Sequence, residues 1–280
     1  MNKLINLNPF QNVQATGLAY CDLGNLADST IESLNLTLGG TSFTKAMITG
    51  IYLRVNTKVV FEADGTKLDL LEAFKGYTGD ATHLSINLME LKARTINAFR
   101  SGSILWDGAA GIKSMRLEVQ ITGATAPTLS GVAEVSRGVI NQGEEALARY
   151  MARHHRATQT ISAGGVKTGL LVPHIDPFAG GSSFKRIAIY SSNLTAIQVV
   201  RGGVTELDMT VADLNFMQKK AGRVPQTGMT VLDFILDNTI LGNVWQTTPD
   251  VCNSAQVYGT FSAGENITID TEELLQLASY

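Results

Sequence analysis

Charged side chains are scarce in this 280-residue sequence, where they make up 17% of the residues against 44% that are hydrophobic. The composition indicates a globular chain, because disordered chains combine low hydrophobicity with high net charge. So few charges leave much of the surface uncharged, which favours a protein whose sides are covered by neighbouring subunits. The net charge of −3 argues against a dedicated nucleic-acid-binding protein, and we expect no sequence-specific nucleic-acid partner.

Cysteine is almost absent, since the chain holds only Cys21 and Cys252. We expect two free, buried thiols, which excludes a disulfide framework. The sequence also lacks a long apolar run, because no window approaches the roughly 18 uncharged apolar residues of a membrane span. Met1–Asn12 has no apolar core long enough for a signal peptide. We therefore expect synthesis and folding in a cytoplasm.

Sequence motifs of catalysis are missing too. The chain has no GxSxG, HExxH, CxxC or GxGxxG. Gly108–Ser114 and Gly164–Thr168 resemble phosphate-binding loops, but an apolar residue stands between glycine and lysine, and neither is expected between a strand and a helix. We therefore predict no catalytic residue, no required cofactor and no enzymatic activity.

Metal-binding patterns are weak. The four histidines are His83, His154, His155 and His174. A cupin-type site would need several histidines and a carboxylate converging from the strands of one barrel. Only His174 lies near a carboxylate, Asp176, and we interpret it as a turn histidine. The metal ligands, if any, are unknown at this point.

The remaining acidic and basic residues are interpreted as surface groups. Asp64, Asp80 and Asp107 lack the spacing of an EF-hand loop. Asp233 and Asp237 are expected on the surface rather than as an acid pair. A basic cluster is expected as a solvated or subunit-packed segment, with phosphate binding as the less favoured alternative; it comprises Arg149, Arg153, His154, His155 and Arg156.

Short stretches bounded by turn signals, several of them alternating apolar and polar residues, predict strands at a spacing of roughly 8–12 residues, which is typical of a β-sandwich or jelly roll. The first set is Gly17–Leu23, Ile31–Leu38 (closed by Gly39-Gly40), Met47–Val55, Lys58–Ala63, His83–Met89, Ile104–Trp106, Met115–Ile121 and Val132–Val135. The second set is Gly169–Val172, Phe184–Tyr190, Thr195–Val200, Thr230–Leu236, Gln256–Phe261 and Ile267–Asp270.

An internal repeat organises these strands. Ile48–Gly79 predicts two strands, a turn and a short amphipathic helix over Lys67–Lys75 that ends at Gly76, and Phe184–Gly222 repeats this order. The proposed alignment pairs Ile51–Leu53 with Ile187–Ile189, Asp64-Gly65 with Gly202-Gly203, Leu70–Phe74 with Ala212–Phe216, and Trp106 with Trp245. The period is that of a whole domain, so the sequence predicts two copies of one domain.

One stretch changes character. Gly143–Arg156 has acidic residues at its start, arginines toward its end and an apolar stripe, which predicts a connecting helix. The predicted domains are therefore residues 1–140, a connecting helix or linker at 141–157, and a second domain at 158–280.

The start LNPFQNVQATGLAYCDL, the run IESLNLTLGG and the continuation ITGIYLRVNTKVVFEADGTKL carry a resemblance. With the duplicated sandwich pattern, they resemble the double jelly-roll major capsid proteins of tailless, icosahedral, membrane-containing bacteriophages, in particular the corticovirus-type coat protein. The resemblance is most specific over about the first 90 residues and extends to the whole chain through the repeat and the length.

The resemblance implies an all-β fold of two tandem eight-stranded jelly rolls, with a short helix after the second hairpin of each and a connecting helix. It implies a structural role in the virion, after synthesis in the host cytoplasm. Homotrimeric, pseudo-hexameric capsomers would tile an icosahedral shell over an internal membrane. Further partners would be penton or minor capsid proteins and that membrane. Structural calcium is compatible with the resemblance, with no ligand assigned.

Two other functions remain as alternatives. A tandem β-sandwich that binds carbohydrate would need exposed aromatic residues, which make up only 7% of the chain, and we expect Trp106 and Trp245 in the core rather than as sugar platforms. A cupin-like metalloenzyme is opposed by the histidine count. The apolar arm Met1–Asn12 is a candidate for reaching a neighbouring subunit or the membrane, with a disordered terminus as the alternative.

Overall fold

The computed structural model describes residues 3–77, 79–94, 99, 101–106, 111–137 and 150–276. The chain forms two compact units. Unit 1 comprises Met1–Glu72, Tyr77–His154 and Leu275–Tyr280, and unit 2 comprises Ala73–Gly76 and His155–Leu274.

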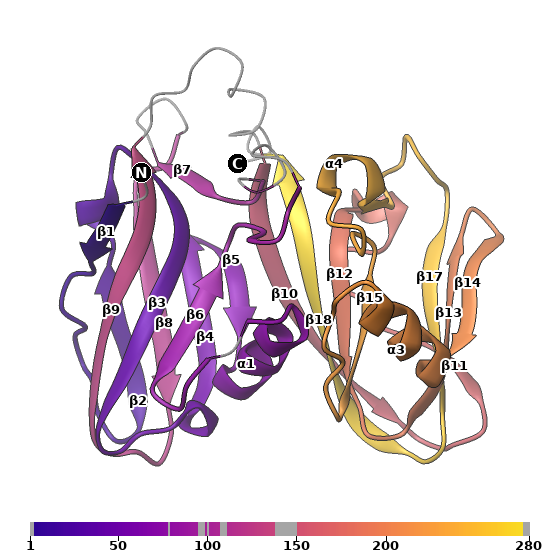
Figure 1. Ribbon diagram of the computed structural model, residues 1–280, viewed down its shortest axis with the longest axis horizontal. Coiled ribbons are helices and arrows are strands. Elements are labelled where there is room, and N and C mark those ends of the chain that lie inside the picture. Colours follow the sequence, from indigo (N-terminus) through magenta and orange to yellow (C-terminus); the bar gives the residue numbers. More distant parts are fainter. Residues whose placement is uncertain are drawn as a thin grey trace. The chain divides into compact units, whose positions relative to one another are not determined.

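Unit 1 contains two layers of antiparallel strands (Figure 1). One layer has the order β1-β9-β3-β6, with β7 paired to β3, and the other has the order β5-β4-β8-β2. The strands are β1 (Lys3–Asn6), β2 (Gly17–Asp22), β3 (Ser29–Ser42), β4 (Ile48–Val55), β5 (Lys58–Ala63), β6 (His83–Asn87), β7 (Ile104–Trp106), β8 (Met115–Ile121) and β9 (Thr125–Arg137).

Unit 2 also contains two layers. One has the order β15-β12-β18-β10, with β16 paired to β12, and the other has the order β11-β17-β13-β14. The strands are β10 (Tyr150–Ile161), β11 (Lys167–Gly169), β12 (Ser183–Tyr190), β13 (Leu194–Arg201), β14 (Val204–Thr210), β15 (Met229–Asp233), β16 (Trp245–Gln246), β17 (Ala255–Phe261) and β18 (Glu265–Gln276). The chain passes from unit 1 to unit 2 within β10.

The two units share one topology. If the described strands of each unit are counted from its first, both units have one layer in the order first-ninth-third-sixth and another in the order second-eighth-fourth-fifth. In both, the short seventh strand pairs with the third. This arrangement is a jelly roll. The predicted all-β fold of two tandem jelly rolls is confirmed, and each strand of unit 1 has its counterpart nine strands later.

A helix follows the fifth strand of each unit, as predicted: α1 (Gly65–Phe74) and α3 (Val211–Lys220); a short α4 (Ile240–Asn243) lies further on. Both longer helices end with the same backbone hydrogen bonds and a glycine at positive φ, Gly76 at 83° and Gly222 at 82°. Glycine adopts this left-handed conformation without strain and so terminates the helix. Matching the glycines also pairs the buried Leu68 with the buried Leu214.

The predicted alignment of the repeat is wrong in register. Ile51–Leu53 lies on the fourth strand of unit 1, but Ile187–Ile189 lies on the third strand of unit 2. Gly202-Gly203 forms the turn between β13 and β14, so it is not the counterpart of Asp64-Gly65. Alternating apolar patterns look alike in every half-buried strand, and therefore a slip of one strand leaves the sequence match intact.

In the helices the same alignment is displaced by four residues. It pairs Leu70–Phe74 with Ala212–Phe216, whereas the matched glycines pair Leu70 with Phe216. Positions four residues apart occupy the same helical face, which explains why the apolar pattern tolerated this slip.

The prediction of a connecting helix is also wrong for those of its residues that the structure describes. Residues 141–149 lie outside the described part, but Tyr150–Arg156 belongs to strand β10. His154 pairs in parallel with Phe61 of β5, and the Arg156 guanidinium binds the Asp270 carboxylate. Tertiary pairing of this kind overrides a helical pattern. The domain boundaries at 140 and 158 stay predictions.

Three further details differ from the expectations. β3 continues through Gly39-Gly40 instead of ending there. Glycine is needed at position 40 because β9 lies so close that a Cβ would be 2.1 Å from the Ala126 carbonyl oxygen. Lys3–Asn6 of the arm forms β1 and pairs with β9 of the same unit, which contradicts the alternative of a disordered terminus there; contact of the arm with a neighbouring subunit or the membrane stays a prediction. The thiol of Cys252 is only half-buried.

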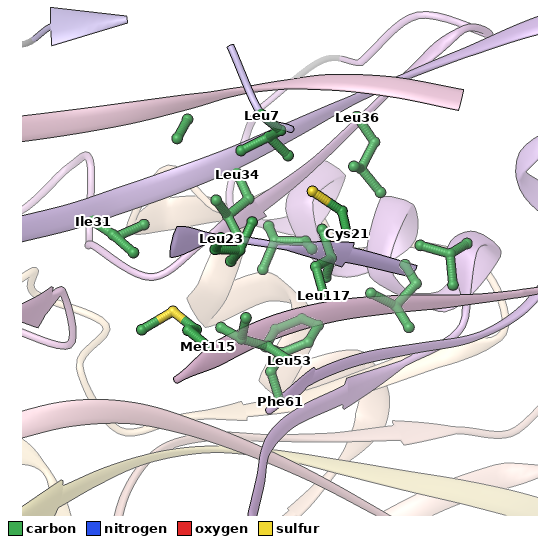
Figure 2. Close-up of a cluster of buried hydrophobic side chains, with 14 of the residues drawn as sticks. Leu7, Cys21, Leu23, Ile31, Leu34, Leu36, Leu53, Phe61, Met115 and Leu117 are labelled. Atoms are coloured by element: carbon green, nitrogen blue, oxygen red, sulfur yellow. The ribbon is translucent and has the colours of Figure 1, made fainter. Parts of the chain in front are cut away.

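The core of unit 1 lies between its two layers (Figure 2). Ile31, Leu34 and Leu36 of β3 meet Leu53 of β4 and Leu117 of β8, and none of these side chains is exposed. Unit 2 has a separate core cluster of its own. The pattern follows from strand geometry, since alternate residues of a strand face the same side.

The tryptophans are core residues, as predicted. Trp106 and Trp245 are 7% and 4% exposed, and they lie on the counterpart strands β7 and β16. Their register differs by two residues, because Trp106 lies opposite Ser29 and Trp245 opposite Phe184. Neither ring is available as a sugar platform.

We predict that Leu34→Ala destabilises unit 1 by about 2–5 kcal/mol, because it removes buried apolar contacts and leaves a cavity. Chemical denaturation followed by intrinsic fluorescence would measure the loss. Leu4→Ala is the matched control, since Leu4 is 69% exposed. Equal effects of the two substitutions would contradict this assignment of the core.

Candidate functional site

The predicted chemistry-bearing residues do not converge on a catalytic or metal centre. Within the described ranges, no group of three or more His, Cys, Asp or Glu side chains is placed to hold a metal ion. Gly164–Thr168 runs from the connection after β10 into strand β11, so it lacks the strand-to-helix context of a phosphate loop. The described helices include none that is long and apolar enough to cross a membrane.

The histidines have separate environments. His83 is exposed and pairs with Asp80, and His154 is buried against the ring of Phe61. His155 and His174 contact each other edge to face, with ring centroids 4.5 Å apart.

The carboxylate beside His174 is not the predicted one. His174 Nδ1 lies 3.2 Å from Glu273 Oε1, whereas Asp176 accepts a hydrogen bond from the backbone N–H of Phe178. The turn interpretation of His174 still agrees with the structure, because the residue has a positive φ of 55°.

The most developed polar cluster is buried in unit 2, on the outer face of the layer β15-β12-β18. Arg186 of β12 is fully buried and lies opposite Asp233 of β15 and Glu272 of β18 in the strand register. Its Nε is 3.2 Å from Asp233 Oδ1, and its Nη1 donates to Glu272 Oε2 at 2.9 Å. Asp233 was predicted on the surface, and that prediction is wrong because this outer face is covered.

Two further cations cover this cluster. Arg223, which follows α3, donates from Nε to Asp233 Oδ2 at 2.6 Å and from Nη2 to the carbonyl of Ile235. Lys75, which follows α1 and belongs to unit 2, donates from Nζ to Glu272 Oε1. Every charge therefore meets an opposite charge, as burial requires.

The cluster controls the ionisation of Glu272. Burial alone would raise its pKa, but Lys75, Arg186 and Lys185 outweigh burial and hold the pKa well below the ordinary value of 4.5. Glu272 is therefore a buried carboxylate that stays ionised at neutral pH.

Unit 1 has an open pocket where unit 2 has this cluster. A cavity of about 310 Å³ lies on the outer face of β3, β6 and β9, against α1. Its lining includes Ser33, Asn35, Ser85, Asn87, Tyr77, His83 and the carboxylates Asp69, Glu72, Asp80 and Glu134. Two lysines lie close to this lining, since Lys45 pairs with Asp69 and the Nζ of Lys92 is 5.5 Å from the centroid of the Tyr77 ring.

All four pocket carboxylates have partners, and Glu72 accepts a hydrogen bond from the side-chain amide of Asn87 at 2.6 Å. Asp69 pairs with Lys45 at 2.5 Å, and Asp80 pairs with His83 at 2.7 Å. Glu134 is half-buried and accepts a hydrogen bond from the hydroxyl of Ser33 at 3.3 Å.

Helix α3 exposes an apolar and basic surface. Phe216 and Met217 are 67% and 45% exposed, and Lys219 and Lys220 beside them are also exposed. We call these four residues the α3 face. Exposed apolar groups gathered beside charges are typical of interaction surfaces. Sequence reasoning missed both this face and the buried cluster, because neither has a recognisable local motif.

We predict that Arg186→Met lowers the free energy of unfolding by about 3–5 kcal/mol, because Asp233 and Glu272 lose a buried partner. Arg116→Met is the control, because its ion pair with Asp22 is about half exposed and such pairs contribute about 0–1 kcal/mol. Urea unfolding would separate the two. A small loss in Arg186→Met would mean that the cluster does not hold these strands together.

We predict that part of the acid sensitivity comes from Glu272. Its folded-state pKa is lowered, so its contribution is complete well above pH 4.5 and is lost as the pH falls below 4.5 toward the folded value. Glu272→Gln should be less stable than the wild type at pH 7 and should lose less further stability between pH 5 and pH 3. Thermal unfolding across this range measures both slopes, and parallel curves would refute the prediction.

Comparison with protein-family models gives two matches. The model described as viral coat protein P2 N-terminal domain matches residues 4–136, and the model described as viral coat protein P2 C-terminal domain matches residues 151–277. Comparison with curated protein sequences finds no match.

Solved structures share the fold at low sequence identity. The major capsid protein P2 of bacteriophage PM2 is 17% identical, with a TM-score of 0.83 over 98% of this chain and 97% of that one. The STIV MCP is 12% identical, with a TM-score of 0.72 over 99% and 97%. A chain of the PBCV-1 virus capsid is 9% identical, with a TM-score of 0.60 over 98% and 93%.

The two family matches together span most of the sequence, and each falls on one jelly roll. The absence of enzymatic activity that the sequence predicted agrees with this family. The chain belongs to the viral coat protein P2 family and is a structural, non-enzymatic component of a virion capsid that assembles with copies of itself.

Proposed function

We propose that this chain is the major capsid subunit of an icosahedral virion and that three copies form a pseudo-hexameric capsomer. The observation that supports a trimer is the duplicated topology, in which each chain supplies two jelly rolls with the same strand order. Three chains present six similar domains around a three-fold axis. A trimer can therefore occupy a position in the shell where it has six neighbouring capsomers.

The surface of the chain supports burial in an assembly. Several large apolar side chains are strongly exposed, with Phe178 at 86%, Leu4 at 69%, Phe216 at 67% and Val204 at 65%. Covering these side chains with another subunit would stabilise an assembly, since the burial of apolar area contributes about 25 cal/mol per Å². In a closed shell each would be covered by a neighbouring subunit.

The proposal also includes specific partners of the capsomer. Capsomers would tile the shell over an internal membrane and meet penton or minor capsid proteins at special positions. Calcium would act as a structural ion between subunits, and we assign it no ligand residue.

We predict that the purified chain has a solution mass of about 90 kDa, three times the 30.0 kDa of one chain. Multi-angle light scattering with and without Ca²⁺ measures it, and growth into larger particles would support capsomer assembly. A monodisperse monomer under all conditions would overturn the trimer. A trimer whose mass does not depend on Ca²⁺ would contradict only the structural role proposed for calcium.

A further inference from the structure

The fifth strands of the two units differ in what lies at their outer edge. In unit 1, Phe61 of β5 pairs in parallel with His154. His154 lies in the opening part of β10, which belongs to unit 1. In unit 2, β14 is the last strand of the layer β11-β17-β13-β14, so no described strand covers its outer edge. An edge strand of this kind can accept a further strand through its backbone N–H and C=O groups.

The residues of β5 and β14 can be matched. Each strand shows a register shift against the fourth strand at the same place in the hairpin. Beyond the shift, Leu53 pairs with Phe61 in unit 1, and Val199 pairs with Leu207 in unit 2. Phe61 and Leu207 also lie equally far before the glycines that end α1 and α3. Phe61 therefore corresponds to Leu207, but Phe61 is 5% exposed and Leu207 is only half-buried.

The third and ninth strands of the two units can be matched in the same way. Both third strands carry a register shift against the ninth strand, directly before Ser33 in β3 and directly before Arg186 in β12. Ser33 therefore corresponds to Arg186. Opposite them on the ninth strands lie Glu134 and Glu272, so these two glutamates correspond as well.

The first strands follow from the ninth. Two side-chain pairs join β10 to β18, Arg156 with Asp270 and Thr160 with Asn266. This antiparallel register places His154 opposite Glu272. In unit 1, Leu4 of β1 lies opposite Glu134. Leu4 therefore corresponds to His154, although Leu4 is 69% exposed and His154 is 3% exposed.

His154 shows how a first strand covers the edge of a fifth strand. Its ring stacks on Phe61 with centroids 4.7 Å apart, and its Nδ1 donates to the carbonyl oxygen of Glu62 at 2.5 Å. The corresponding residues of the uncovered edge and of the other first strand are Leu207 and Leu4. Both are aliphatic and both are accessible, so the same contact made by these two residues would be an apolar one.

We propose that, in the capsomer, β1 of one copy lies parallel to the outer edge of β14 of a second copy, with Leu4 packed beside Leu207. The contact repeats between chains the pairing of His154 with Phe61. It rests on the proposed self-assembly into trimers, and it names the two strands that meet.

The register favours a second copy as the occupant of this edge. The strand that covers β5 is the first strand of a jelly roll, and β1 is the other first strand of the chain. β1 is also the end strand of its layer, so its outer side is open to a partner. Addition of one strand to an exposed sheet edge is a recurrent mode of protein recognition.

The contact also has a direction. β1 is on unit 1 and β14 is on unit 2, so each copy offers one strand of each kind. Head-to-tail contacts of this kind close into a ring when the rotation per subunit allows it. Three such contacts would close the proposed trimer.

The first test places a charge in the contact. Leu4→Asp should weaken trimer formation by about tenfold or more, because a carboxylate beside Leu207 would lose water without gaining a partner. Leu18→Asp is the matched control and should leave the mass unchanged, since Leu18 is a 37%-exposed leucine of β2, which ends the other layer of unit 1. Sedimentation velocity over a concentration series gives the association constants, and circular dichroism checks that both variants are folded.

A disulfide test reports the contact directly. Chains with Leu4→Cys are co-expressed with chains with Leu207→Cys, and the purified trimers are treated with a mild oxidant. Neighbouring residues of paired strands are close enough for a disulfide, so we expect a linked dimer on non-reducing gels. Neither variant alone should form it. Val204→Cys in place of Leu207→Cys is the register control, because Val204 is 65% exposed but lies three residues away along β14.

The outcomes separate the strand contact from the trimer. The expected link, together with weaker association of Leu4→Asp, supports the pairing. A wild-type trimer that tolerates Leu4→Asp, that forms no link, or that links Leu4→Cys to Val204→Cys instead of Leu207→Cys, would overturn the pairing of β1 with β14 and leave the trimer in place. A wild-type monomer would overturn both.

Discussion

Arg186 lies between two carboxylates, and the arrangement of unit 2 depends on this placement. One guanidinium on the third strand contacts Asp233 on the sixth and Glu272 on the ninth, so it bridges three strands in their correct register. A slip of one residue would turn the arginine toward the apolar core and leave both acids without it. Arg223 and Lys75 can then complete the charge balance, which ties the ends of α3 and α1 to the same layer.

The two jelly rolls show how one topology serves different surroundings. Strand order, hairpins, helices and glycine caps are shared, whereas the residues on the outer face differ. Unit 2 carries an arginine where unit 1 carries a serine, and a cavity lies beside that serine. The same strand topology therefore supports different side chains at corresponding positions of the outer face.

Much of the fold was predictable because it is periodic. Lys58–Ala63, Ile104–Trp106 and Met115–Ile121 have the predicted bounds, and in Met115–Ile121 the four apolar residues of the alternating pattern are all buried. Periodicity could not decide which strands correspond, because every such strand has the same pattern. Tyr150–Arg156 failed for a related reason: its helical spacing is local, whereas its pairing partners are distant in sequence.

The candidate site was not predictable in the same way. Arg186, Asp233 and Glu272 meet only because sheet register brings together three strands that are far apart in sequence. A lone arginine within an apolar run gives no local signal of its partners. Likewise, the exposure of Phe216 follows from the packing of α3 and not from its helical pattern.

Unit 2 is made of two separate segments of the chain, and this limits how the chain can be divided into fragments. Ala73–Gly76 belongs to this unit although it precedes the rest of it by about eighty residues. A fragment cut at the family boundary, residues 151–277, would lack Lys75 and the backbone that meets Val224. The segment that matches the family model and the compact unit of the structure are therefore different pieces of chain, and a circularly permuted or split gene would have to carry this short segment along to keep these contacts.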